Sequence, residues 1–563
     1  MRDIMVPMSF DKLINQCLTE YRTKKSLFDV KAIVTADTEK NMEFCGRGLE
    51  SPLGVAAGPH TQLAQNIVAC YAGGARFIEL KTVQVMYGEE LGIQKPCIRA
   101  NDEGYNVEWS SELHALEAMN EYIRAWFATK IVAKEFGLGN PDAFQFNMSV
   151  GYNLEGIKTP AVDGFLNGLN DASTTKVFQE CKQYLLDNLH LFENVDADFI
   201  NSIPAHVCNT ITLSTMHGCP ADEIEKIAAY LIEEKGFNTF IKCNPTLLGY
   251  DYVRKIMDDM GYDYLSIDKH QFEIDLKFDQ AVKMINNLIA LAKIKGVKFG
   301  VKLCNTMPVD IKHKELPGNT MYMSGKSLYP LAISLAKILG EAIGEGLEIS
   351  FSGGADKNNI DEIFEAGIYP ITVCTTLLQP MGYEKLAKLY EQLHAIEYPT
   401  ARKLNLAKIN ELVEKVRTDK NYCKSEAQRK KTDEHISYEG VSEKDNLKCK
   451  VLCQTCIRVC PNRANTYIET SEGKILLHID DSCNECGNCQ YLCIQPCLPY
   501  RDRLTYFSSK QMMEESENKG LSIQGNKYLV RLEKEIVECT YDELSDFMKS
   551  VVDSIKKTHS YLI

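Results

Sequence analysis

The chain has 563 residues, of which 45% are hydrophobic and 25% charged, and its formal net charge is −14. The length allows two to four domains, and the composition is that of an ordinary soluble protein. The negative charge argues against nucleic acid or an anionic membrane as a partner. No basic, apolar leader and no apolar run of membrane-spanning length stands out, so we expect a cytoplasmic protein. The 21 cysteines then indicate a reducing compartment, in which thiols stay free or bind metal.

Short apolar runs typical of strands alternate with amphipathic helical runs between residues 50 and 395. This alternation predicts repeated βα units, so we expect an α/β fold with a (β/α)8 TIM barrel over 50–395 and segment 1–49 packed on it. Helices are predicted at Glu112–Phe136, Ala221–Lys235 and Phe278–Lys295. Ten runs qualify as strands, although a barrel needs eight: Gly54–Gly58, Phe77–Val83, Phe144–Val150, Asp198–Ile203, Thr210–Thr215, Thr239–Asn244, Tyr264–Asp268, Phe299–Asn305, Ile349–Gly353 and Ile371–Thr375.

The sequence changes character after residue 395. Lys, Glu, Asp and Ser dominate from Arg417 to Asn446, which predicts a charged linker or a solvated helix within a linker segment at 396–446. A cysteine-rich domain is expected over 447–507, and a strand-helix extension over 508–563. In that extension Lys527–Cys539 alternates like a strand, and the capping-box pattern from Thr540 to Glu543 predicts the start of a helix that ends near Lys557.

Nine cysteines lie between Cys449 and Cys497. Thiolates about three residues apart converge on one iron–sulfur cube, and in two-cluster ferredoxins the fourth ligand comes from the other motif. The spacing, with Pro461 after Cys460, therefore predicts a ferredoxin-like domain with two [4Fe–4S] clusters. The first cluster would be bound by Cys449, Cys453, Cys456 and Cys493, and the second by Cys460, Cys483, Cys486 and Cys489.

Two departures leave alternatives open. Cys449 and Cys453 are one residue further apart than in the usual C-x-x-C, and Cys497 is a ninth cysteine that could replace Cys493. Pairs of C-x-x-C also bind zinc, but zinc sites use two well-separated pairs, whereas each motif here has three close thiols. A disulfide framework belongs to small secreted domains and is disfavoured.

Two consecutive late strands end in residues suited to bind phosphate. Ser352-Gly353-Gly354-Ala355 follows one strand and precedes a helix expected near Asn359, and the hydroxyls of Thr375 and Thr376 follow the next. Backbone N–H groups at such a turn bind anions, and the loops after the last two strands form the usual phosphate site of a TIM barrel. An ordinary tight turn is the alternative for either glycine pair alone.

Seven short motifs lie at or near the predicted strand ends. They are Gly54-Val-Ala56-Ala57-Gly58, Lys81-Thr82, Tyr152-Asn153, Lys242-Cys-Asn-Pro245, Asn305-Thr306, Ser324-Gly325 and Gly353-Gly354. Through most of residues 50–385 they resemble the FMN-binding barrel of the dihydroorotate and dihydropyrimidine dehydrogenase superfamily. The resemblance implies FMN contacts at these positions, with the first motif under the flavin and lysines that stabilise the anionic reduced flavin.

With the cysteine array included, the chain resembles the family called "putative selenate reductase", whose members occur among enzymes of purine degradation. The resemblance implies an oxidoreductase in which FMN exchanges a hydride with an N-heterocycle and single electrons with iron–sulfur clusters, under low oxygen. Several members continue into an FAD- and NADPH-binding half. No G-x-G-x-x-G fingerprint follows a strand here, so we expect a separate FAD/NAD(P)H-binding subunit and a hetero-oligomer.

Reduction of a C=C or C=N bond needs a general acid, and Met216-His217-Gly218-Cys219-Pro220 is the best candidate loop. Cys219 stands before a predicted helix, which favours a lowered thiol pKa, and His217 could hold the substrate or tune Cys219. A buried structural cysteine is the alternative. The amides of Asn153, Asn201, Asn244 and Asn305 suit a cyclic ureide or purine, such as urate, or a pyrimidine.

Two other functions stay open. One is an electron-transfer subunit whose barrel binds flavin but no substrate. The other is an oxyanion reductase, which is disfavoured because a flavin barrel without molybdenum has no evident way to take oxygen from selenate.

Overall fold

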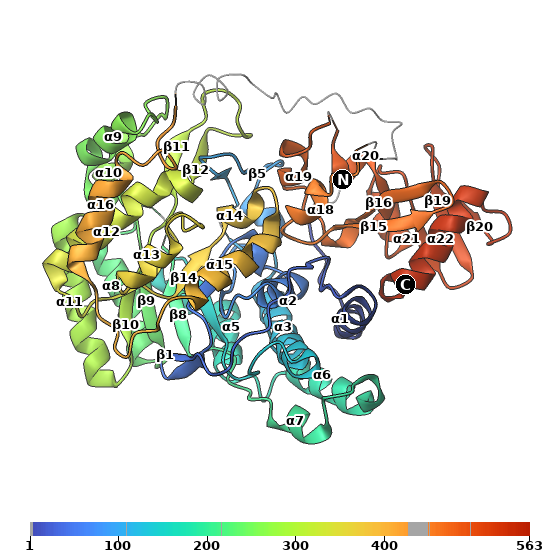
Figure 1. The fold of residues 1–563 in the computed structure, drawn as a ribbon, viewed down its shortest axis with the longest axis horizontal. Coiled ribbons are helices and arrows are strands. Elements are labelled where there is room, and N and C mark those ends of the chain that lie inside the picture. The colour runs from blue at the N-terminus through green and yellow to red at the C-terminus, as the bar shows by residue number, and fades with distance from the viewer. Residues whose placement is uncertain (1–3, 109, 216, 426–448, 450, 496) are drawn as a thin grey trace.

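The computed structural model describes residues 4–108, 110–215, 217–425, 449, 451–495 and 497–563. The chain forms a large α/β part, blue to orange, and a smaller C-terminal part with its own mixed sheet, orange to red (Figure 1). Most of the predicted charged linker, residues 426–446, lies outside the described residues.

A closed barrel of eight parallel strands is the centre of the larger part. The strands follow one another around the barrel in chain order, and the last pairs with the first. This confirms the predicted (β/α)8 barrel. Its strands are β3 (Leu53–Val55), β4 (Phe77–Glu79), β7 (Gln145–Val150), β8 (Thr210–Leu213), β9 (Asn238–Cys243), β10 (Phe299–Leu303), β13 (Glu348–Phe351) and β14 (Ile371–Val373).

Two of the ten predicted strands are wrong. Asp198–Ile203 lies in helix α7 (Ala197–Ser202), because the Asp196 carboxylate accepts a hydrogen bond from the N–H of Phe199 and caps a helix. Tyr264–Asp268 is a loop that leads into α10 (Lys269–Ile274), and Asp268 caps that helix in the same way. Short apolar runs do not distinguish a strand from a helix or a loop, and only local capping decides.

Helices surround the barrel. The helix predicted at Phe278–Lys295 is α11 (Phe278–Lys295), whereas the predicted Glu112–Phe136 begins three residues later and the predicted Ala221–Lys235 ends two earlier. The other helices of this part are α2 (Ala64–Ala72), α3 (Ala115–Phe136), α4 (Leu154–Ile157), α5 (Pro160–Asn170), α6 (Lys176–Asp187), α8 (Ala221–Glu233), α9 (Tyr250–Asp259), α12 (Tyr329–Ile343), α13 (Ile360–Glu365), α14 (Thr375–Leu378) and α15 (Lys385–His394).

Two small sheets close the ends of the barrel. The hairpin of β1 (Met42–Phe44) and β2 (Arg47–Leu49) packs Phe44 against the barrel residues Phe77 and Phe240, with ring centroids 5.3 and 5.5 Å away. At the opposite end, four strands form an antiparallel sheet that we call the lid sheet. Its order is β11 (Met307–Asp310), β12 (Thr320–Met323), β6 (Tyr105–Asn106) and β5 (Ile98–Arg99).

The C-terminal part is a six-stranded mixed sheet with short helices around it. The predicted strand Lys527–Cys539 is two antiparallel strands. The predicted terminal helix starts later, because Ser545, not Thr540, caps it. The elements are α18 (Thr455–Arg458), β15 (Asn465–Thr470), β16 (Gly473–Ile479), α19 (Asn488–Tyr491), α20 (Pro499–Asp502), β17 (Leu504–Tyr506), α21 (Lys510–Glu515), β18 (Gly520–Gln524), β19 (Lys527–Arg531), β20 (Val537–Cys539) and α22 (Asp546–Thr558).

Segments from outside 50–395 also belong to the packed barrel part. Helix α1 (Phe10–Lys24) lies between the two parts, because it contacts both α3 and the chain end near Tyr561 (Figure 1). Helix α16 (Leu406–Val416) buries Ile409, Leu412 and Val413 against the barrel's outer layer, so part of the predicted linker is core. In the part of the chain that the structure describes, no helix combines the length and the apolar character needed to cross a membrane.

A buried ion pair next to β4 offers a test of how the barrel core is stabilised. Arg76, fully buried, donates to a carboxylate oxygen of Glu50 at 2.8 Å and to three backbone carbonyls. We expect Arg76→Met to lower the free energy of unfolding by about 3–5 kcal/mol, since it leaves the buried Glu50 carboxylate without its cationic partner, with only the N–H of Asn140 still bonded to it. Urea denaturation measures this. Lys176→Met, which breaks an exposed pair with Glu180, is the control and should cost below about 1 kcal/mol; equal losses would contradict the expectation.

Candidate functional site

A cavity of about 430 Å³ opens at the carboxyl ends of the barrel strands, below the lid sheet. The segments after β3 and β4 and the ends of β9 and β10 line it, as the position of active sites in such barrels leads one to expect. Thirteen of the predicted cofactor-binding residues lie in its wall: Ala56, Ala57, Gly58, Lys81, Thr82, Lys242, Asn305, Thr306, Ser324, Gly325, Gly354, Thr375 and Thr376.

Three loops meet at one end of the cavity and form what we call the phosphate cup. Gly325 and Gly354 have φ of 71° and 79°, and a Cβ on Gly354 would lie 2.2 Å from the carbonyl oxygen of Gly325. Only glycine fits this approach. The hydroxyls of Ser324 and Thr375 lie 2.7 Å apart, and Thr376 completes the wall. Small residues and hydroxyl donors at a barrel's late loops are the donor set that a phosphate group requires.

The floor of the cavity is charged. Lys242 reaches it from β9, and Lys81 lies 3.4 Å from the Glu108 carboxylate. Beneath them, buried Glu79 pairs with Lys302 at 3.2 Å and accepts the N–H of Ala57 at 3.0 Å. Burial lowers the pKa of Lys242, and the negative charge of Glu79 opposes that shift. A cation held here, next to the phosphate cup, suits an anionic or electron-accepting ligand.

A histidine–aspartate pair faces the same cavity. His217 Nδ1 lies 2.6 Å from Asp275 Oδ2, while Nε2 is buried without a hydrogen-bond partner among the described residues. Asp275 also accepts hydrogen bonds from Thr246 Oγ1 at 2.7 Å and from the N–H of Gly218. Although burial raises the pKa of Asp275, these donors and His217 bring it below its ordinary value. The ionised carboxylate therefore fixes the ring and leaves Nε2 for a ligand.

Cys219 has a different environment from the one predicted. Burial, with the charges of Glu223 and Asp222, raises its pKa to about 11, so the prediction of a lowered pKa is wrong. Its side chain lines a small neighbouring cavity with Thr215 and Asp275 instead of the main one. Met216, from the same motif, lies outside the described residues.

Several predicted asparagines do not reach the main cavity. Asn153 caps α4 through a 2.8 Å hydrogen bond from the N–H of Gly156, and Asn201 is exposed on α7. Asn244 lies behind the wall, where it accepts from Asn305 Nδ2 at 3.0 Å and donates to Asp275 at 3.3 Å. Gly353 is packed against Ala332 and does not line the cavity either.

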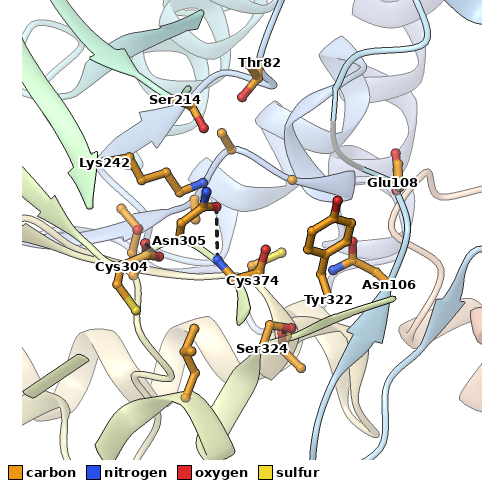
Figure 2. A pocket seen from close by; sticks show the side chains of 18 of the residues that line it. Thr82, Asn106, Glu108, Ser214, Lys242, Cys304, Asn305, Tyr322, Ser324 and Cys374 are labelled. Carbon is orange, nitrogen blue, oxygen red and sulfur yellow. Dashed lines mark hydrogen bonds between the residues drawn. The ribbon is translucent and has the colours of Figure 1, made fainter. Parts of the chain in front are cut away.

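The sequence did not reveal the residues of the lid. Asn106, Glu108 and Tyr322 come from or follow strands β6 and β12 and lie across the cavity from Lys242 and Asn305 (Figure 2). Strand β6 has only two residues, which is too short for a period-two pattern. Asp275 could not be predicted because it lies 58 residues after His217 in the sequence and meets it only in the folded chain. Ser214, Gln84, Ser110 and Gln271 also line the cavity.

The cysteines predicted to bind the second cluster line one small cavity together with Tyr500 of α20. Backbone N–H groups of Ala464 and Glu485 point at the sulfurs of Cys460 and Cys483, each at 3.3 Å. Four thiols around one space, with N–H donors to sulfur, are the donor set that an iron–sulfur cube requires. The four are Cys460, Cys483, Cys486 and Cys489.

The first group is less buried. Burial, together with the nearby thiols of Cys493, Cys449 and Cys453, raises the pKa of Cys456 to about 12. Cys497 Sγ lies 3.4 Å from Cys493 Sγ, so the choice between these two stays open. Within the described residues, no three or more His, Cys, Asp or Glu side chains lie close enough together to hold a single metal ion.

The second cysteine group is fixed directly to the lid and the phosphate cup. The carbonyl oxygen of Cys486 accepts the N–H groups of Cys97 and Ile98 at 3.0 and 2.9 Å, beside and in β5. Asn488 donates to the carbonyl of Leu378, the last residue of the helix that starts at Thr375. The cysteine domain therefore contacts both walls that enclose the cavity.

A barrel with an anion cup, a charged floor and a histidine–aspartate pair, next to a cysteine-rich domain, is the layout of an oxidoreductase. The chain belongs to the YgfK oxidoreductase family: residues 28–424 match the family model described as "Oxidoreductase YgfK, N-terminal TIM-barrel domain". Two curated relatives, both "Putative oxidoreductase YgfK", from Escherichia coli strains K12 and O157:H7, are 42% identical over 426 residues.

The alignment covers 73% of this chain and 41% of each relative, so the chain spans about two fifths of the length of these relatives. Among solved structures, a DHODH from Eimeria tenella in complex with ferulenol matches with a TM-score of 0.40 and 12% identity, over 69% of this chain and 91% of that chain.

The lowered pKa of Asp275 predicts a pH-dependent stability. A carboxyl group with a folded-state pKa below its unfolded value of about 3.9 stabilises the fold above that value and loses the effect as pH falls through the folded pKa. Asp275→Asn should therefore unfold at lower urea than the wild type at pH 7, and the gap should shrink below about pH 4. Exposed Asp251→Asn is the control. A gap that stays constant with pH would contradict this.

Proposed function

We propose that the chain is an FMN- and iron–sulfur-dependent oxidoreductase subunit that reduces an unsaturated N-heterocycle, a purine such as urate or a pyrimidine. The observation that supports it best is the single cavity that combines a phosphate cup, a cationic floor and the His217 ring, next to a buried group of four thiols. The heterocycle and its purine class rest on the sequence resemblance alone.

The residues of the cavity fit FMN. The phosphate cup would bind the phosphate group through the hydroxyls of Ser324 and Thr375 and the close backbone approach at Gly354. Lys242 and Lys81 would place positive charge near the ring system. When bound, FMN would supply hydride chemistry toward the substrate and one-electron chemistry toward iron–sulfur clusters.

The cysteine groups fit two [4Fe–4S] clusters. The second group, buried against the lid sheet, would hold the cluster nearer the cavity, and the half-exposed first group would hold the one nearer solvent. Electrons would arrive from a separate FAD/NAD(P)H-binding subunit of a hetero-oligomer. The proposal of this partner rests on the sequence, in which no G-x-G-x-x-G fingerprint follows a strand.

We assign proton transfer to His217 in preference to Cys219. His217 lines the cavity and Asp275 holds its ring by Nδ1, so in the protonated ring Nε2–H would be the proton given to a bound ligand. Cys219 is turned toward the adjacent cavity and has a raised pKa, which makes its thiol a weak acid. Asn106, Tyr322 and Asn305 supply amide and hydroxyl groups for the hydrogen bonds of a heterocycle.

The alternative function is an electron-transfer subunit without a substrate. The buried, unpartnered Nε2 of His217 and the polar lid residues disfavour it, because a site that only relays electrons has no need of them.

The composition of the purified chain tests the cofactor assignment. Anaerobic purification should yield one FMN and about eight irons per chain from the eight cluster cysteines. Cys460→Ser, which removes one thiol of the buried group, should lower the iron content and leave FMN in place. Cys539→Ser is the matched control outside the array and should change neither. Zinc in place of iron would contradict the assignment.

Substrate-dependent reoxidation of the reduced chain tests the proton donor. His217→Gln removes the acidic N–H, so we expect the rate to fall by about 10²–10⁴ with FMN and iron retained. Cys219→Ser and exposed His190→Gln should stay near the wild-type rate. If Cys219→Ser shows the large loss and His217→Gln does not, Cys219 is the acid, as its place in the sequence predicted.

A further inference from the structure

Below the cavity, the charge of one buried carboxylate interacts with the charges of two lysines. Glu79 on β4 and Lys302 on β10 are each 1% exposed, and their charged atoms are 3.2 Å apart. Neither lines the cavity, whereas Lys242 on the neighbouring strand β9 does. The three side chains together have two potential cations and one anion.

Lys302 is saturated with partners inside the barrel. Besides Glu79, its ammonium group donates to Thr372 Oγ1 at 3.0 Å and to Ser350 Oγ at 3.4 Å, which accounts for its three N–H donors. The ammonium group of Lys302 therefore bonds to Glu79 and its neighbours and does not line the cavity. Lys242, in contrast, forms no hydrogen bond or ion pair with Glu79 among the described residues, and Glu79 acts on it only through its charge.

We propose that Lys302 is a charge-balancing residue of the flavin site. By holding Glu79, it prevents that carboxylate from neutralising Lys242, so the positive charge of Lys242 acts on the group bound in the cavity. The inference rests on the proposed function, because it needs FMN in the cavity. Buried charges interact over several ångströms more strongly than charges in water, so a residue outside the cavity wall can have this effect.

The sign of the effect follows from charge. Reduction of FMN adds negative charge, which a net positive floor stabilises. Without Lys302, Glu79 is free to compensate Lys242, and the reduced form loses stabilisation. Without Glu79, both lysines act on the flavin, and the reduced form gains it. A structural role for the pair would predict loss of folding or of FMN in both cases, with no opposite shifts.

The test is the midpoint potential of bound FMN, titrated anaerobically against dyes of known potential in the full chain with its clusters. Lys302→Met should lower the potential and Glu79→Gln should raise it. The double variant Glu79→Gln/Lys302→Met should return close to the wild type. We expect each single shift to match at least a tenfold change in the equilibrium, about 30 mV for a two-electron couple.

Lys130→Met is the matched control, because Lys130 is also buried and ion-paired but lies on α3 outside the barrel. It should leave the potential unchanged. If Lys302→Met does not fold, the other two variants decide, since Glu79→Gln removes the anion and should raise the potential, whereas the double variant restores the net charge and should return the potential close to the wild type. Unchanged potentials, or shifts of equal sign in both single variants, with FMN bound, overturn this inference alone. A wild-type chain that binds no FMN overturns the proposed function and this inference together.

Discussion

The attachment of the cysteine loop to the lid strand is the contact on which the proposed chemistry depends. The Cys486 carbonyl accepts two backbone N–H groups at the start of β5, and Gly487, with φ of 81°, packs its Cα face on Pro96. Backbone hydrogen bonds of this kind allow little movement. They hold a buried group of four thiols beside the sheet that covers the cavity, so the two sites proposed to exchange electrons keep a fixed separation.

Buried charge is handled in one way throughout the barrel. Each fully buried cation considered above has a carboxylate or several carbonyl oxygens beside it, as for Arg76 with Glu50 and Lys302 with Glu79. Asp275 is the counterpart on the acidic side, with donors on both oxygens. Such pairs are costly to break. Buried polar atoms are almost always hydrogen-bonded, so an unpartnered atom of a cavity residue, such as His217 Nε2, is a candidate to bind a ligand.

The sequence identified much of this arrangement where the evidence was local. Glycine pairs, lysines and hydroxyls that directly follow strands were placed at the cavity, since strand ends of a barrel share one face. Contacts that form only on folding could not be predicted from the sequence. Examples are the two-residue strand that contains Asn106 and the pairing of His217 with Asp275, which are 58 residues apart. The raised pKa of Cys219 was also missed, because a position at the start of a helix suggests a low pKa, whereas burial and the nearby carboxylates of Glu223 and Asp222 depend on the fold.

Anomalous diffraction at the iron edge, from crystals of the full chain grown without oxygen, tests the account most directly. The account predicts two iron peaks, one among Cys460, Cys483, Cys486 and Cys489 and one beside Cys456, with FMN density that has its phosphate group between Gly325 and Gly354. Iron absent from the buried group, or a cavity that holds no flavin while the iron peaks are present, would contradict it.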